Sequence, residues 1–379
     1  MPLEFTSSNM NMFAIPFAVG LLLTACELLF LKLVKRQDIP WKEVVFNLDS
    51  GHILMWVFRG VEIAAYGVAL KYLSLHWLDG WNPVAKWVFA FFAWDLCFYW
   101  RHRMHHRLQF LWAVHVVHHQ GEHFNLSLCN RNSWYASLTD FPFTGVLAIL
   151  GVPLEIYVAV SSFHYSVQFY NHSGMIRTSG MLDRFLITPL HHRVHHSADP
   201  QHFNRNFGGT FLIWDRLFGT FHQAHPGNEM RYGVAGGEAS NNPFWASNAP
   251  LLRYFGVNLP RSSERQDFIA SDGFIASGGL ILFGLLIYYV NGDIGNMTAE
   301  RWTLFTGILA ATVALGGISD GRRWGAICWI ALAFTIPALF IGHLGLRGPV
   351  PVLLFSVWLL HGIDGLRRWL ENSKRISDA

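Results

Sequence analysis

Long apolar runs alternate with polar loops along most of the chain, and the runs have the length that a bilayer requires. A helix needs about 20 predominantly apolar residues to cross the hydrocarbon core. We therefore predict a membrane-spanning helix from each of seven runs: 13–34, 51–73, 83–101, 268–290, 302–318, 323–343 and 349–366. This pattern predicts an all-α fold, a polytopic membrane bundle of helices.

A further apolar region, residues 134–170, is interrupted. Pro142, Gly145, Gly151 and Pro153 lie within it, and both residue types disfavour a continuous helix. We predict two helices that form a membrane hairpin and return the chain to the side from which it came. The hairpin is rich in Phe and Val, which makes it a candidate wall for a bound lipid chain; simple anchoring is the alternative.

The composition supports a membrane protein and excludes some partners. Of 379 residues, 52% are hydrophobic and only 14% are charged, whereas soluble domains carry about 25% charged residues. The net charge of +3, without a long basic run, argues against nucleic-acid binding. The four cysteines lie far apart without a CxxC pair, so we expect reduced thiols.

Basic residues orient the predicted spans. Lys and Arg gather after the first and third runs, at 322–323 and in the C-terminal tail, whereas loops 74–82 and 291–300 lack them. Because short cytoplasmic loops carry the excess of positive charge, we predict an external N-terminus and a cytoplasmic C-terminus. This topology places every dense histidine cluster in a cytoplasmic cap. We predict three parts: N-terminal transmembrane helices at 1–84, a histidine-rich domain at 85–250 that is the candidate for catalysis, and a C-terminal transmembrane bundle at 251–379.

Three histidine clusters carry the candidate chemistry. They read HRMHH from 102, HVVHH from 115 and HHRVHH from 191. On a helix, positions i, i+3 and i+4 share one face, so each cluster presents two or three imidazoles in one direction. Neutral imidazole is the commonest protein ligand for transition metals, and a bound metal explains how so many neighbouring bases stay uncharged.

Nine histidines are candidate metal ligands, and no dense set of carboxylates accompanies them. One metal takes roughly four to six ligands, so nine indicate two metals and a di-metal site. The nine are His102, His106, His115, His118, His119, His172, His192, His195 and His196. His105 and His191 are candidates for supporting positions beside them.

Three other polar residues are candidates for a catalytic role through the ligands: Asp95, Glu122 and Asn125. Asp95 lies two helical turns before His102 on the same face. We therefore predict that its carboxylate accepts a hydrogen bond from a ligand imidazole.

These residues resemble the fatty acid hydroxylase/sterol desaturase superfamily of membrane di-iron oxygenases. That family carries three histidine motifs, called boxes, with the patterns H-x3-H, H-x2-H-H and H-x2-H-H. They are matched by His102–His106 (first box), His115–His119 (second box) and His192–His196 (third box). The segments TPLHHRVHH (188–196) and NFGGTFLIWDRLFGTF (206–221) also resemble sequences of that family. The resemblance is dense over about 85–225.

Within that superfamily the chain most resembles the alkylglycerol monooxygenases, through GEHFNLS (121–127) and the extra membrane bundle after the third box. The resemblance implies two irons, with zinc as a possible substitute, O2, and hydroxylation of an aliphatic carbon of a membrane lipid. For the ether-lipid members it also implies tetrahydrobiopterin as electron donor and attack on the O-alkyl chain. Arg107 stands where those members are expected to carry an acidic residue, so a redox protein stays open as the donor.

Two alternatives remain open at this stage. A fatty acyl or sterol hydroxylase or desaturase would use the same ligand boxes. A histidine-rich metal transporter or sensor would need ionisable residues inside its spans, and the cores of 268–290 and 349–366 contain almost none. The sequence does not define an oligomeric state.

Overall fold

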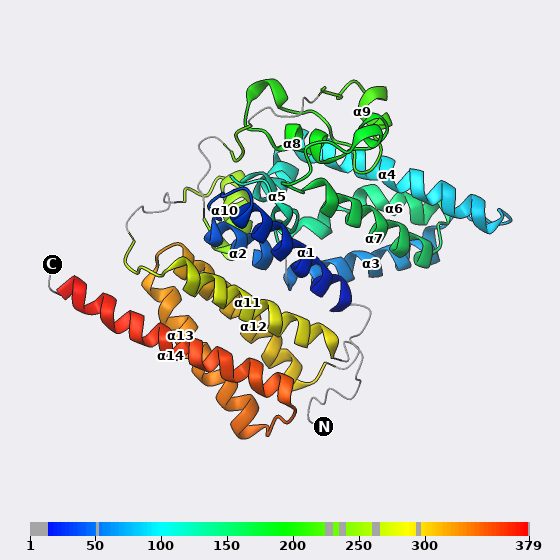
Figure 1. Cartoon of the computed structure of the whole chain (residues 1–379). Helices are drawn as coiled ribbons and strands as arrows, with labels where there is room; N and C mark the ends of the chain where they lie inside the picture. The colour runs from blue at the N-terminus through cyan, green and yellow to red at the C-terminus, as the bar shows by residue number, and fades with distance from the viewer. Residues whose placement is uncertain are drawn as a thin grey trace. The chain divides into compact units, whose positions relative to one another are not determined.

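The computed structural model describes residues 14–50, 53–223, 230–234, 240–259, 266–292 and 297–377, with side chains described as far as Glu371. Within these ranges the protein is helical, and the one strand-like feature is an isolated antiparallel bridge between Leu186 and Phe211 (Figure 1). The predicted all-α fold is confirmed.

The α-helices are α1 (Ala14–Leu33), α2 (Trp41–Ser50), α3 (Leu54–Leu73), α4 (Pro83–Arg107), α5 (Gln109–His119), α6 (Phe141–Leu150), α7 (Leu154–Asn171), α8 (Pro189–His196), α9 (Ile213–Leu217), α10 (Pro243–Tyr254), α11 (Asp272–Asn291), α12 (Ala299–Ser319), α13 (Arg323–Pro337) and α14 (Pro349–Ser377). Short 3-10 helices are η1 (Leu126–Asn130), η2 (Ala136–Thr139), η3 (Gly180–Arg184) and η4 (Pro200–His202), and η5 (Ala338–His343) is a π-helical end of α13.

Six helical segments within the described residues are long and apolar enough to cross a membrane, so the chain is an integral membrane protein. They are Ala14–Leu33, Trp41–Leu73, Asp272–Asn291, Ala299–Ser319, Arg323–His343 and Pro349–Glu371. Six of the seven predicted spans overlap these segments over most of their length. Residues 13, 51 and 52 lie outside the described ranges, and the segment Trp41–Leu73 runs across the last two. The seventh, 83–101, forms part of α4, which is not among the six segments because Lys86 and Asp95 make it less apolar.

The chain forms two compact units, and each unit combines segments that are separated in the sequence. One contains Met1–Ile53, Glu238–Ala246 and Pro260–Ala379, and the other contains Leu54–Gly237 and Ser247–Leu259. In the first unit, α12 and α13 approach closely: a Cβ added at Gly325 would lie 2.7 Å from the Ala314 carbonyl oxygen. The division at 1–84, 85–250 and 251–379 stays a prediction about functional parts.

The second unit holds the histidines on a scaffold of α3, α4, α6 and α7. Tyr66 of α3 stacks on Tyr157 of α7, with ring centroids 3.9 Å apart. The region 134–170 contains the two separate helices α6 and α7. Gly151 ends α6 at a φ of 91°, a left-handed conformation that favours glycine, and Pro153 precedes α7.

Candidate metal centre

Four segments bring the nine predicted histidines together. α4 continues without a break through the first box, and Leu108 then leaves the helical conformation, at φ −102° and ψ 120°, before α5 begins with the second box. Proline starts α8, which carries the third box, and His172 caps the C-terminus of α7. The ring centroids of His102 and His195 lie 4.3 Å apart even though the two residues belong to the first and third boxes.

The nine histidines form two groups. Within each group, one nitrogen from every residue lies within 4.8 Å of the nitrogens of the others. The five-histidine group contains His102, His106, His115, His119 and His195, and the four-histidine group contains His118, His172, His192 and His196. Both groups draw on α5 and α8, because neighbouring positions on each helix point to different groups.

Backbone carbonyls determine which nitrogen several rings present. A carbonyl oxygen only accepts a hydrogen bond, so a ring nitrogen that bonds to it carries the proton and leaves the other nitrogen as a lone pair. This second bond is the usual way in which a protein orients a metal-bound imidazole. The Nδ1 atoms bonded in this way are those of His102 to Phe207 (2.9 Å), His118 to Arg131 (2.9 Å), His172 to Gln168 (2.7 Å) and His195 to Arg205 (2.9 Å).

The freed lone pairs converge in the four-histidine group. The Nε2 atoms of His118 and His172 lie 3.3 Å apart, and both rings carry their proton on Nδ1. Two such neutral rings have no proton to share between them. Nitrogens bound to one ion at about 2.0–2.1 Å lie about 3–4 Å from each other. A metal ion would therefore satisfy both lone pairs at the observed spacing.

The five-histidine group shows the same need for a metal. Nε2 of His106 and Nε2 of His195 are buried without a hydrogen-bond partner, and a buried polar atom left unpaired costs free energy. A donor set made of imidazole alone suits transition metals better than Mg²⁺ or Ca²⁺, which prefer oxygen. The residues present therefore fit a metal site.

Burial keeps these imidazoles uncharged. Desolvation lowers the pKa of all nine histidines below the ordinary value of 6.5, and repulsion from neighbouring rings lowers it further for most of them. The pKa values of His172 and His195 fall to about 4. An uncharged imidazole is the form that binds a metal.

Residues 87–220, which contain all nine histidines, match the family model described as fatty acid hydroxylase. This segment is similar to that family, and we call it the hydroxylase domain below. The chain is also similar to two alkylglycerol monooxygenases. It is 34% identical to the Danio rerio protein over 227 residues, which are 58% of this chain and 49% of that protein. It is 36% identical to the Homo sapiens protein over 164 residues, 43% of this chain and 36% of that protein.

A lathosterol oxidase from Mus musculus is 30% identical over 206 residues, which are 49% of this chain and 61% of that protein. The matched part of the chain thus spans about half the length, or less, of the alkylglycerol monooxygenases. No solved structure is significantly similar to the chain.

Within the hydroxylase domain, Asp95 acts on a loop and not on a histidine of either group. Its buried carboxylate accepts hydrogen bonds from the backbone N–H of Thr210 (2.8 Å), the backbone N–H of Phe211 (3.0 Å) and Nε1 of Trp214 (2.9 Å). The predicted hydrogen bond to a ligand imidazole is not found. Two helical turns separate Asp95 from His102 by about 10 Å along α4, which is too far for the two side chains to meet.

A second buried carboxylate holds the same loop at the point where it supports the metal centre. Asp215 accepts from the backbone N–H groups of Phe207 and Gly208, each at 2.7 Å, and the Phe207 carbonyl in turn accepts from His102. The loop must approach α4 closely, because a Cβ at Gly209 would lie 2.8 Å from Oδ1 of Asp95. The sequence reasoning missed these carbonyl acceptors, since a backbone group leaves no residue signature.

The other two predicted catalytic residues lie outside both histidine groups. Asn125 caps η1: its Oδ1 accepts from the backbone N–H of Ser127 at 3.0 Å and from the Ser127 hydroxyl at 2.6 Å. Glu122 is exposed on the turn after α5. Their proposed catalytic role stays a prediction.

His105 and His191 lie beside the groups without joining them. His105 places Nδ1 2.7 Å from the Arg101 carbonyl oxygen and Nε2 2.9 Å from the Thr139 hydroxyl oxygen. His191 places Nδ1 3.2 Å from the hydroxyl oxygen of Thr188. These hydrogen bonds go to residues outside the two groups, so the supporting role of His105 and His191 stays a prediction.

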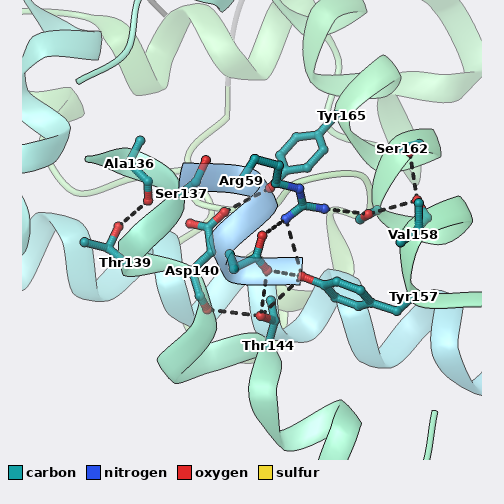
Figure 2. A network of polar contacts seen from close by, with 12 residues as sticks. Arg59, Ala136, Ser137, Thr139, Asp140, Thr144, Tyr157, Val158, Ser162 and Tyr165 are labelled. Carbon is teal, nitrogen blue, oxygen red and sulfur yellow. Dashed lines mark hydrogen bonds and ion pairs between the residues drawn. The ribbon is translucent and has the colours of Figure 1, made fainter. Parts of the chain in front are cut away.

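A buried network of charged and hydroxyl side chains ties α3 and α7 to the start of α6 (Figure 2), and Arg101 extends it to α4. Arg59 donates to Glu62 and to Ser161 of α7, and Tyr165 donates to Asp140, which also pairs with Arg101. Sequence reasoning missed this network. Its signal was present, because Arg59 and Glu62 stand three residues apart inside a predicted span, where ionisable residues are costly and seldom incidental.

Proposed function

We propose that this protein is a membrane di-iron monooxygenase that inserts one atom of O2 into an aliphatic C–H bond of a membrane lipid. The observation that carries the proposal is the convergence of nine neutral imidazoles into two groups inside the hydroxylase domain. Each group would hold one metal. Two irons bound there would supply the oxidising power that saturated carbon requires, a chemistry that side chains alone lack.

The two groups differ in access, which supports a direction of approach for the reactants. All four members of the four-histidine group are buried, whereas His106 and His115 of the five-histidine group are half-buried. We infer that the lipid carbon and O2 approach the metals beside His106 and His115. The buried four-histidine group would exclude water from the opposite side.

The substrate we propose is the O-alkyl chain of an alkylglycerol. Similarity to two alkylglycerol monooxygenases supports this choice. The reaction balances as an ether C–H bond plus O2, two electrons and two protons, giving a C–OH group and water. The new hydroxyl would share its carbon with the ether oxygen, and such a hemiacetal breaks down to an aldehyde and a glycerol lipid.

The proposed electron donor is a reduced pterin, with a redox protein as the alternative that Arg107 leaves open. We place both histidine groups on the cytoplasmic side, where reductants are available. The support for this side is the distribution of Lys and Arg between the loops.

The deciding experiment measures oxygen uptake by the full-length protein in lipid nanodiscs after anaerobic loading with ferrous iron. Alkylglycerol, the matched fatty acyl glycerol and a sterol are supplied in turn, each with and without reduced pterin. We expect uptake and aldehyde release with the alkylglycerol. Uptake with the acyl glycerol or the sterol alone would change the substrate class, and no uptake with any lipid would contradict the oxygenase.

A pair of histidine variants separates ligand loss from general damage. His195→Ala should lower the bound iron, because four imidazoles hold the ion more weakly than five, and should abolish activity while the protein still inserts into the membrane. His202→Ala is the matched control, because His202 is also buried but lies outside both groups, with Nδ1 2.9 Å from the Ser197 hydroxyl oxygen. A full iron content in His195→Ala would remove His195 from the ligand set.

A further inference from the structure

Two short helices of the hydroxylase domain expose an unusual amount of apolar surface. Five large apolar side chains on η3, the residue after it and α9 are exposed to solvent, and we call them the η3–α9 surface. They are Met181 (72% exposed), Leu182 (51%), Phe185 (62%), Ile213 (56%) and Leu217 (67%). Exposed apolar patches of this kind mark contacts with a membrane or a partner.

The backbone builds this surface from two distant segments. Leu212 donates its N–H to the Phe185 carbonyl at 2.9 Å, and Ile187 donates to the Thr210 carbonyl at 2.9 Å. Together with the bridge between Leu186 and Phe211, these bonds hold η3 and α9 side by side. The surface is therefore a fixed feature of the fold, and its apolar side chains are presented together.

The surface continues onto the outer face of α4. Phe211, at the edge of α9, stacks on Phe92 of α4 with ring centroids 4.9 Å apart, and Phe218 packs against Trp100 at 5.0 Å. Phe92 is 45% exposed and Trp100 is 37% exposed. In an integral membrane protein, one apolar surface that runs from a long helix onto its neighbours is suited to lipid.

The exposed charges of η3 and α9 are positive, and the carboxylate of η3, Asp183, is half-buried. Arg184 and Arg216 are exposed within η3 and α9. The nearby carboxylate, Asp183, accepts hydrogen bonds from the hydroxyl groups of Thr178 and Thr188, each at 2.6 Å. Large apolar side chains beside arginines are the pattern of segments that lie in the membrane interface and contact anionic headgroups.

We propose that the η3–α9 surface lies in the headgroup region of the bilayer, with its apolar side chains among the upper acyl chains and its arginines on anionic phosphates. Continuity with the exposed face of α4 favours a lipid surface over an acidic soluble protein as the occupant. Ile187 and Thr188 lead directly from this surface into α8 and its ligand box. The surface thus anchors the hydroxylase domain to the bilayer at a point close to the histidine groups.

Local depth measurement tests the proposal in the full-length protein. The four native cysteines are replaced, a single cysteine is introduced as Met181→Cys or Leu217→Cys, and a fluorophore is attached. The protein is placed in vesicles of phosphatidylcholine and phosphatidylglycerol. We expect a nitroxide attached to lipid to quench both labels several-fold more than a label at Gln201→Cys, an exposed position on η4. Acrylamide in the water should show the opposite order.

Charge removal provides the second arm. Arg184→Gln combined with Arg216→Gln should reduce lipid quenching of the label at 217 in vesicles with phosphatidylglycerol, and should have little effect in phosphatidylcholine alone. Bound metal should stay unchanged, which separates this result from any failure of the proposed catalysis. Labels as accessible to acrylamide as the one at 201 would overturn the proposal, as would protection that appears only when an acidic soluble protein is added.

Discussion

The two histidine groups share one type of ligand but differ in number, access and support. The five-histidine group has two half-buried members, and the loop around Arg205 and Phe207 supplies its carbonyl acceptors. The four-histidine group is buried throughout, and its acceptors are Gln168 on α7 and Arg131 just beyond η1. If each group holds one metal, as we propose, the metal in the five-histidine group would be open to reactants and the other would be enclosed.

The largest expected effect comes from removing one ligand from each group. His192→Ala leaves three imidazoles in the enclosed group, so we expect one metal per chain to be lost. His106→Ala leaves four imidazoles in the open group, so we expect that group to keep its metal with weaker binding. Metal analysis of the purified proteins by mass spectrometry distinguishes the two outcomes. An equal loss of metal from both variants would contradict the proposed difference between the two groups.

Acid provides the next largest effect. Burial lowers the pKa values of the nine histidines below 6.5, to about 4 for His172 and His195. The unfolded chain therefore binds more protons than the folded chain between these values. The free energy of unfolding therefore keeps its full value above pH 6.5 and decreases as the pH falls toward 4. We expect metal release over the same interval, from the open group first, because its half-buried rings can hydrate when charged. Thermal unfolding and metal release measured in parallel against pH check both claims.

Removal of a carboxylate that supports only one histidine group should weaken metal binding in that group alone. Asp215→Asn disturbs the two backbone hydrogen bonds that hold Phe207 and Gly208, and so the carbonyl that orients His102. We expect a loss of about 10–100-fold in metal affinity at the open group, the usual size for such supporting partners. Asp320→Asn is the control, because Asp320 binds Ser240 and Asn241 in the other unit. Weakening of the enclosed group by Asp215→Asn would contradict this division.

The smallest effect is expected at Thr139. Thr139→Val removes the hydroxyl that contacts His105, whose ring centroid lies 5.3 Å from that of His115 in the open group. We expect a stability loss of about 1 kcal/mol, as for a typical buried hydrogen bond, and a slight change in the open site. Calorimetry of the metal-loaded protein measures it. Thr188→Val, which removes the hydroxyl that contacts His191, is the counterpart at the start of α8.

The sequence predicted the helical fold and the nine histidines because both follow from local spacing. Apolar runs of bilayer length predict helices, and the i, i+3, i+4 pattern places imidazoles on one face. The same pattern does not say which metal each ring serves. His118 and His119 are neighbours on α5 and belong to different groups, and only the crossing of α5 with α8 determines that.

The supporting contacts could not be predicted because they join distant segments through the backbone. Asp95 was predicted to support a ligand imidazole, but the hydrogen-bond partners of its carboxylate lie in a loop more than a hundred residues later. The pair Arg59 and Glu62 did leave a signal, since two opposite charges within one apolar run must meet inside the protein. Attention to charges inside the spans would have found that network.

If a metal binds between His118 and His172 as proposed, their inward-facing lone pairs would couple metal supply to the stability of the folded chain. A folded chain without metal leaves these nitrogens unsatisfied, so binding free energy contributes directly to folding free energy. Chains made when iron is scarce would open more often and become substrates for proteolysis. Such a membrane enzyme would be regulated by its own turnover, its abundance following iron availability without any dedicated sensor.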